Sequence, residues 1–129
     1  MEVHALRLHH SYFATLLALV LHQIDAAYWR EWEMFHLPGG VQGYLAFNLL
    51  AIALVLVGYR HVLLGTAHAR RYARICAALG IATFAIHAGF AAFGERSFHL
   101  PLSIAIILAC LLGGLHLAWA SRAGHAAGR

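Results

Sequence analysis

Four long apolar runs, separated by short polar turns, make up most of this chain. They predict helices at about 11–34, 41–64, 72–93 and 101–121. A bilayer core of about 30 Å takes about 20 helical residues, and each run reaches that length. The segments HLPGG at 36–40 and GERSFHLP at 94–101 contain the proline and glycine residues that end helices. The pattern therefore predicts an all-α fold that crosses a membrane four times.

Short connections favour an up-down-up-down arrangement, so we expect a four-helix transmembrane bundle. Residues 1–129 would then form a single integral membrane domain. The tetrapeptide FHLP occurs at 35–38 and again at 98–101, at the same place in each half of the chain. This recurrence raises the hypothesis of two duplicated helical hairpins, related by an axis along the membrane normal.

Composition strengthens the membrane interpretation. Hydrophobic residues make up 62% of the chain and charged residues only 11%, whereas soluble domains contain about 25% charged residues. The net charge of +4 comes with nine basic residues, all arginine, which lie at the ends of apolar runs. Membrane topology explains that placement, so we expect no nucleic-acid partner. One side of the bundle would collect Arg7, Arg60, Arg70, Arg71, Arg74, Arg122 and Arg129. The positive-inside rule then predicts both termini in the cytoplasm.

The segment 22–36, HQIDAAYWREWEMFH, contains three of the five acidic residues. At about 100° per residue on a continuous helix, His22, Asp25 and Glu33 fall on one narrow stripe, and Glu31 points the opposite way. Ionisable groups in a lipid-embedded helix are costly and usually face a bundle interior or a cavity. The stripe therefore predicts a polar site inside the bundle.

A second histidine is expected at the same depth. His22 lies eight residues before Arg30, and His87 lies eight residues before Glu95. Eight residues correspond to about 12 Å along a helix, so both imidazoles would lie in the outer half of the bundle.

Imidazole and carboxylate together are the ligand set of zinc, iron, manganese or copper. We therefore hypothesise a metal-binding protein, with zinc or iron favoured. The candidate ligands are His22, Asp25, Glu33 and His87. Glu33 lies about 12 Å from Asp25 on an ideal helix, which is far for ligands of one ion. It is therefore also a candidate for the general base, which would be the catalytic residue of a small metalloenzyme, or for a residue at the mouth of the site. Tyr44 and Asn48 on the second helix would support the ligands.

Three alternatives stay open on the sequence alone. His22 and His87 are a possible cofactor-binding pair for haem b in an electron carrier. The polar groups also suit a proton-handling network without metal. The third alternative is a scaffold or transport subunit that forms a homo-oligomer through small residues such as Gly113 and Gly114. Expected partners are membrane lipid and a lipid-soluble small molecule, and the sequence does not decide whether the protein is an enzyme.

The pattern His22-x-x-Asp25, followed by Glu31-Trp32-Glu33 at the outer end of the first helix, resembles small bacterial four-helix membrane proteins of uncharacterised families. One such group is named for its HXXEE motif. Here Asp25 and Ala26 stand where that motif has two glutamates. The resemblance implies a location in the inner membrane of a bacterium. It implies no activity, but it adds weight to the stripe as a site.

Overall fold

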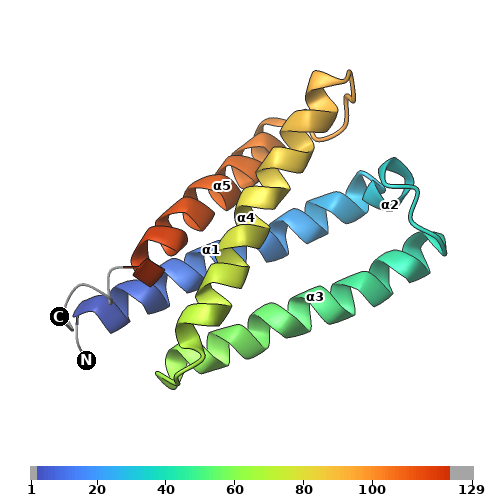
Figure 1. Cartoon of the computed structure of the whole chain (residues 1–129). Coiled ribbons are helices and arrows are strands. Elements are labelled where there is room, and N and C mark those ends of the chain that lie inside the picture. The colour runs from blue at the N-terminus through green and yellow to red at the C-terminus, as the bar shows by residue number, and fades with distance from the viewer. Residues whose placement is uncertain (1–2, 123–129) are drawn as a thin grey trace.

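The computed structural model describes residues 3–122, and the regular structure in that part of the chain is entirely helical (Figure 1). The five helices are α1 (Val3–Tyr28), α2 (Glu31–Met34), α3 (Gly40–Leu63), α4 (Ala69–Ala92) and α5 (Pro101–Arg122). The predicted all-α fold class is confirmed. The last three helices begin and end within about three residues of the expected 41–64, 72–93 and 101–121.

The four long helices lie against one another, and α1 contacts each of α3, α4 and α5. The start of α1 and the end of α5 lie at one end of the molecule in Figure 1, and α2 lies toward the other end, as does the α4–α5 turn. The polar segment after α1 and the second FHLP turn are therefore neighbours in space, although they lie far apart in the sequence.

Small residues allow α4 and α5 to approach closely. A Cβ atom added to Gly80 of α4 would lie 2.6 Å from the carbonyl oxygen of Cys110, and one added to Gly114 of α5 would lie 2.8 Å from that of Ala77. Neither distance is tolerable for a real side chain, so glycine is required at both positions. A Cβ atom on Gly113 would meet the Thr15 hydroxyl of α1 at 2.9 Å. Gly113 and Gly114 thus make contacts within the chain.

Three helices, α3, α4 and α5, are long and apolar enough to cross a membrane by length and composition. Their outer faces carry large apolar side chains in the open, including Leu49, Leu50 and Leu102, which are 72–74% exposed. Contiguous apolar surface of this kind is typical of contact with lipid. The fourth expected span, α1, is long enough, but polar residues such as His22 and Asp25 lower its hydropathy, and it is not among the three.

The first helix also differs from its expected range of 11–34. It begins at Val3 and ends at Tyr28, and a separate helix starts at Glu31. Between them, Arg30 adopts the left-handed conformation, with φ 55° and ψ 49°. A single left-handed residue changes the direction of the chain, so the periodicity of α1 does not extend into α2.

The two FHLP turns are not equivalent in the structure. In the first turn, the residue with a positive φ is the histidine, His36, at 52°. In the second turn it is the phenylalanine, Phe98, at 61°. Phe35 is 43% exposed, and Phe98 is only 5% exposed. The correspondence that duplicated hairpins would produce is therefore not seen at these turns.

Candidate metal centre

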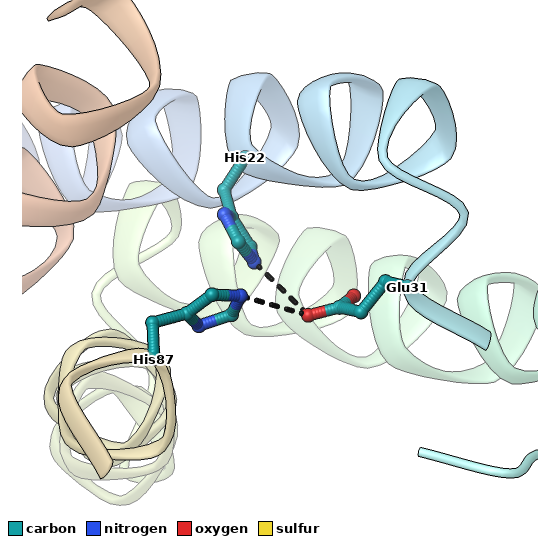
Figure 2. A group of neighbouring side chains, drawn as sticks. All are labelled: His22, Glu31 and His87. Carbon is teal, nitrogen blue, oxygen red and sulfur yellow. Dashed lines mark ion pairs between the residues drawn. The ribbon is translucent and has the colours of Figure 1, made fainter. Parts of the chain in front are cut away.

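Three buried side chains from three helices meet inside the molecule: His22 of α1, Glu31 of α2 and His87 of α4 (Figure 2). One oxygen of the carboxylate, Glu31 Oε1, lies 3.6 Å from His22 Nε2 and 3.1 Å from His87 Nε2. One nitrogen of each imidazole and one oxygen of the carboxylate all lie within 4.8 Å of one another. These three groups form a compact cluster of metal-ligating atoms.

Glu31 reaches the cluster because the helix breaks at Arg30. On a continuous helix Glu31 would face away from His22, as the sequence pattern predicted, and that expectation was wrong. The left-handed turn at Arg30 redirects the chain, and the short helix α2 then starts with Glu31 pointing toward the interior. Figure 2 shows its carboxylate facing both imidazoles. No glycine or proline lies between Tyr28 and Glu31 to announce this break in the sequence.

The two separations between Glu31 and the imidazoles suit a single ion. Zinc and similar ions bind imidazole nitrogen and carboxylate oxygen at about 2.0–2.2 Å. Two ligand atoms at about 2.1 Å from one ion are therefore about 3.0 Å apart at a right angle and about 3.4 Å apart at a tetrahedral angle. The measured separations of 3.1 Å and 3.6 Å lie close to these two values.

Hydrogen bonding assigns the proton on His87. Its Nδ1 atom lies 2.8 Å from the carbonyl oxygen of Thr83, which can only accept, so Nδ1 donates. In the neutral ring, Nε2 then carries a lone pair directed at the carboxylate, and this buried nitrogen has no hydrogen-bond partner in the described part of the chain. Two lone pairs 3.1 Å apart repel each other unless a cation lies between them. A backbone carbonyl that orients a histidine in this way is the usual partner of a metal-ligating imidazole.

Electrostatics keeps the Glu31 carboxylate charged. Burial acts to raise the pKa of this group, but hydrogen bonds and positive charge from His22 and His87 outweigh burial when these imidazoles carry protons, and they lower the pKa to about 2. With protons on the imidazoles, the carboxylate is therefore ionised.

Aromatic packing shields the cluster on the side of the α4–α5 turn. The ring of Phe98 lies 5.6 Å from that of His22 and 4.4 Å from that of His87, centre to centre. The ring of Trp29 lies 5.8 Å from that of Phe98. Phe98 is a bulky residue with a positive φ, an uncommon conformation that surrounding contacts must maintain. The turn therefore holds an apolar ring against both imidazoles, stacked on His22 and edge to face with His87.

The structure places the other two sequence-predicted ligands outside the cluster. Asp25 Oδ1 accepts a hydrogen bond from the Ser103 hydroxyl of α5 at 3.0 Å, and that hydroxyl also accepts one from Trp29 Nε1. Glu33 points to solvent and forms an ion pair with Arg30, with its side chain 54% exposed. Of the four candidates, His22 and His87 come together, and Asp25 and Glu33 do not join them.

Tyr44 and Asn48 lie on α3, one turn apart, and both are buried. The Tyr44 hydroxyl donates a hydrogen bond of 2.6 Å to the backbone carbonyl oxygen of Gln23, and it lies 2.9 Å from the side-chain oxygen of the same residue. Asn48 donates to the Tyr44 carbonyl oxygen. Tyr44 therefore joins α3 to α1 next to His22, whereas the hydrogen bond of Asn48 lies within α3. No hydrogen bond joins either residue to His22, Glu31 or His87 in the described residues.

Two cavities adjoin the cluster. One, of about 190 Å³, lies between α1, α3 and α4 and is lined by all three of His22, Glu31 and His87. The other, of about 160 Å³, touches His87 from the side of α5 and includes Glu95 and Ser97 of the α4–α5 turn. The cluster therefore has free space beside it for a further ligand.

Comparison with protein families gives one match. Residues 8–124 match the model of a family described as "Family of unknown function (DUF6713)". The chain belongs to DUF6713. Neither the curated proteins nor the solved structures include a match to it. The expectation of an uncharacterised family is thus confirmed, whereas the resemblance to the HXXEE group stays a prediction. For this DUF6713 member, function has to be argued from its own residues.

The geometry of the DUF6713 site also bears on haem. In a haem with two axial histidines, the imidazoles approach the iron from opposite faces of the porphyrin. Here the two rings meet edge to face, with centres 4.7 Å apart, and Glu31 Oε1 lies close to both Nε2 atoms. This arrangement favours a small ion over a macrocycle.

Proposed function

We propose that this DUF6713 protein is an integral membrane protein that binds one transition metal ion through His22, Glu31 and His87. The observation that carries the proposal is the convergence of two imidazoles and one carboxylate from three helices, all three of them buried. Buried polar groups are costly without partners, so a cluster whose atoms face one another suits a bound cation.

The proposed membrane arrangement is a four-helix up-down-up-down bundle in which α1 also crosses the bilayer. The apolar outer faces and the short connections support it. The arginine distribution favours both termini in the cytoplasm, and the resemblance to small bacterial membrane proteins favours the inner membrane of a bacterium. The site would then lie toward the outer surface. A homo-oligomer and the absence of a nucleic-acid partner stay predictions from the sequence.

Zinc and ferrous iron are the ions that suit this ligand set best. Two histidines and one carboxylate are a common protein ligand set for catalytic zinc and for non-haem iron. Three protein ligands leave at least one coordination position open, which is typical of catalytic rather than structural sites. When bound, the ion would supply a Lewis acid at that open position. Thr83 would hold His87 through its carbonyl oxygen, and Phe98 would limit the access of water.

The ligand assignment can be tested with two glutamates of the same short helix. Glu31→Gln keeps the size of the side chain but removes the charge, and Glu33→Gln makes the identical change two residues further on. We expect the wild type and Glu33→Gln to bind zinc or ferrous iron at close to one ion per chain after reconstitution. Glu31→Gln should lose binding, and so should His22→Ala. Metal content is measured after gel filtration in detergent without chelator.

The same experiment separates the metal from a proton. An imidazolium between Thr83 and Glu31 would also remove the repulsion at His87 Nε2, and this is the proton-handling alternative. In that case, no variant would differ in metal content and the wild type would stay metal-free even with excess metal. That result, or unchanged binding in Glu31→Gln, would contradict the proposed metal site. A strong Soret band in the visible spectrum would instead support haem.

A further inference from the structure

The cavity of about 190 Å³ next to the cluster has two chemically different parts. One end presents His22, Glu31 and His87. Apart from Gln23 and Thr83, the rest of the lining is apolar, and it includes Leu19 of α1, Val55 of α3 and Leu79 of α4. A site with a hydrocarbon body and one polar end suits an amphipathic ligand whose polar group reaches the metal.

The cavity also has an opening on the outer face of the helices. Phe35, Phe47 and Ile86 line it, and these three side chains are 43%, 53% and 43% exposed. Phe47 and Ile86 belong to α3 and α4, two helices that are apolar enough to cross a membrane. In a bilayer, an opening between these helices faces lipid, so a ligand would enter from the membrane and not from water.

The charge of the proposed centre selects the polar group of the ligand. A divalent ion with one carboxylate and two neutral imidazoles carries a net charge of +1. An uncompensated charge in an apolar interior is costly, so an anionic oxygen ligand at the open position would be stabilised. The second cavity is less suitable, because Glu95 lines it and its carboxylate would repel an anion.

We propose that the cavity binds a medium-chain fatty acid, with its carboxylate on the metal ion and its hydrocarbon chain between α1, α3 and α4. This inference rests on the proposed metal site. An apolar cavity of about 150 Å³ is large enough for benzene, so this one has room for about six carbon atoms. The remaining carbons of the chain would extend through the opening into the lipid.

The experiment uses the full-length protein in lipid nanodiscs, because the alkyl chains of detergents would compete for the cavity. The protein is loaded with Co²⁺, whose visible absorption changes when a further ligand binds to it. Decanoate is titrated against two reference compounds. Acetate has the carboxylate without the chain, and decanol has the chain without the charge. Decanoate should change the spectrum at concentrations where acetate and decanol do not.

Two variants of the same helix locate the chain. Ala51→Phe adds a ring inside the cavity, which Ala51 lines, and Ala53→Phe adds the same ring on the exposed side of α3. Crowding an occupied site typically costs enough to weaken binding by about tenfold or more, so Ala51→Phe should respond to decanoate at about tenfold higher concentration. Ala53→Phe should titrate like the wild type. The acetate response of each variant serves as the internal reference for an intact metal centre.

Each result has one meaning. If no Co²⁺ binds to the wild type, the proposed metal site fails and the fatty-acid site fails with it. If Co²⁺ binds but decanoate acts no better than acetate, only the fatty-acid site is refuted. An equal effect of decanol would refute the role of charge, and an unchanged decanoate response in Ala51→Phe would refute the cavity. Should Ala51→Phe not fold, the three compounds on the wild type still decide the outcome.

Discussion

The conformation of Arg30 determines where Glu31 points, and it makes a prediction with an unusual sign. Arg30 has φ 55° and ψ 49°, between the end of α1 at Tyr28 and the start of α2 at Glu31. Glycine adopts this left-handed conformation readily, whereas any residue with a Cβ atom is strained there. We therefore predict that Arg30→Gly is more stable than Arg30→Ala.

The magnitude follows from the backbone alone. An alanine in the left-handed region costs roughly 1 kcal/mol or more relative to glycine. If residues 22–34 formed one continuous helix instead, alanine would be better than glycine by about 0.8–1.0 kcal/mol. The difference in stability between the glycine and alanine variants therefore has opposite signs for the left-handed turn and for a continuous helix. The two expected values lie about 2 kcal/mol apart. Both variants remove the exposed ion pair between Arg30 and Glu33, so its contribution cancels.

The assay is reversible unfolding in mixed detergent, followed by circular dichroism, without added metal. Arg30→Gly should unfold at the higher denaturant concentration, and it should still bind metal because Glu31 keeps its position. If Arg30→Ala were the more stable variant, the left-handed break would be refuted, and the contact of Glu31 with His22 and His87 would be refuted with it.

Two further predictions concern the packing that holds the site. Gly114→Ala should destabilise the protein by about 1–3 kcal/mol, because its Cβ atom would lie 2.8 Å from the Ala77 carbonyl oxygen. Gly89→Ala is the matched control on α4, where an added Cβ atom meets nothing within 4 Å. This change should stabilise the helix by about 0.5–1 kcal/mol. If both changes had the same sign, the close approach of α4 and α5 would be contradicted. Tyr12→Phe removes a buried hydrogen bond of 2.7 Å to the Val55 carbonyl oxygen and should cost about 1 kcal/mol. Tyr28→Phe is the control, because Tyr28 is 70% exposed, and it should change the free energy of unfolding by less than about 0.5 kcal/mol. Equal effects of the two tyrosine changes would argue against the α1–α3 contact.

Much of the architecture follows from the sequence. Apolar runs of sufficient length predict the long helices, and the proline and glycine turns predict where three of them begin and end. Counting residues back from the turns predicts that His22 and His87 lie at the same depth, and the structure brings these two side chains together. These features depend on helix geometry, which is local and regular, so periodicity is sufficient to predict them.

The third member of the cluster could not be predicted in this way. Helical periodicity selected Asp25 and Glu33, but the structure directs Asp25 to Ser103 and leaves Glu33 exposed beside Arg30. A left-handed residue without glycine has no sequence signal, because tertiary contacts compensate for its strain of about 1 kcal/mol. The sequence therefore determined the helices and the equal depth of His22 and His87. Only the tertiary structure decided that the carboxylate beside them is Glu31, and that a cavity adjoins the three side chains, because both depend on how separate helices pack together.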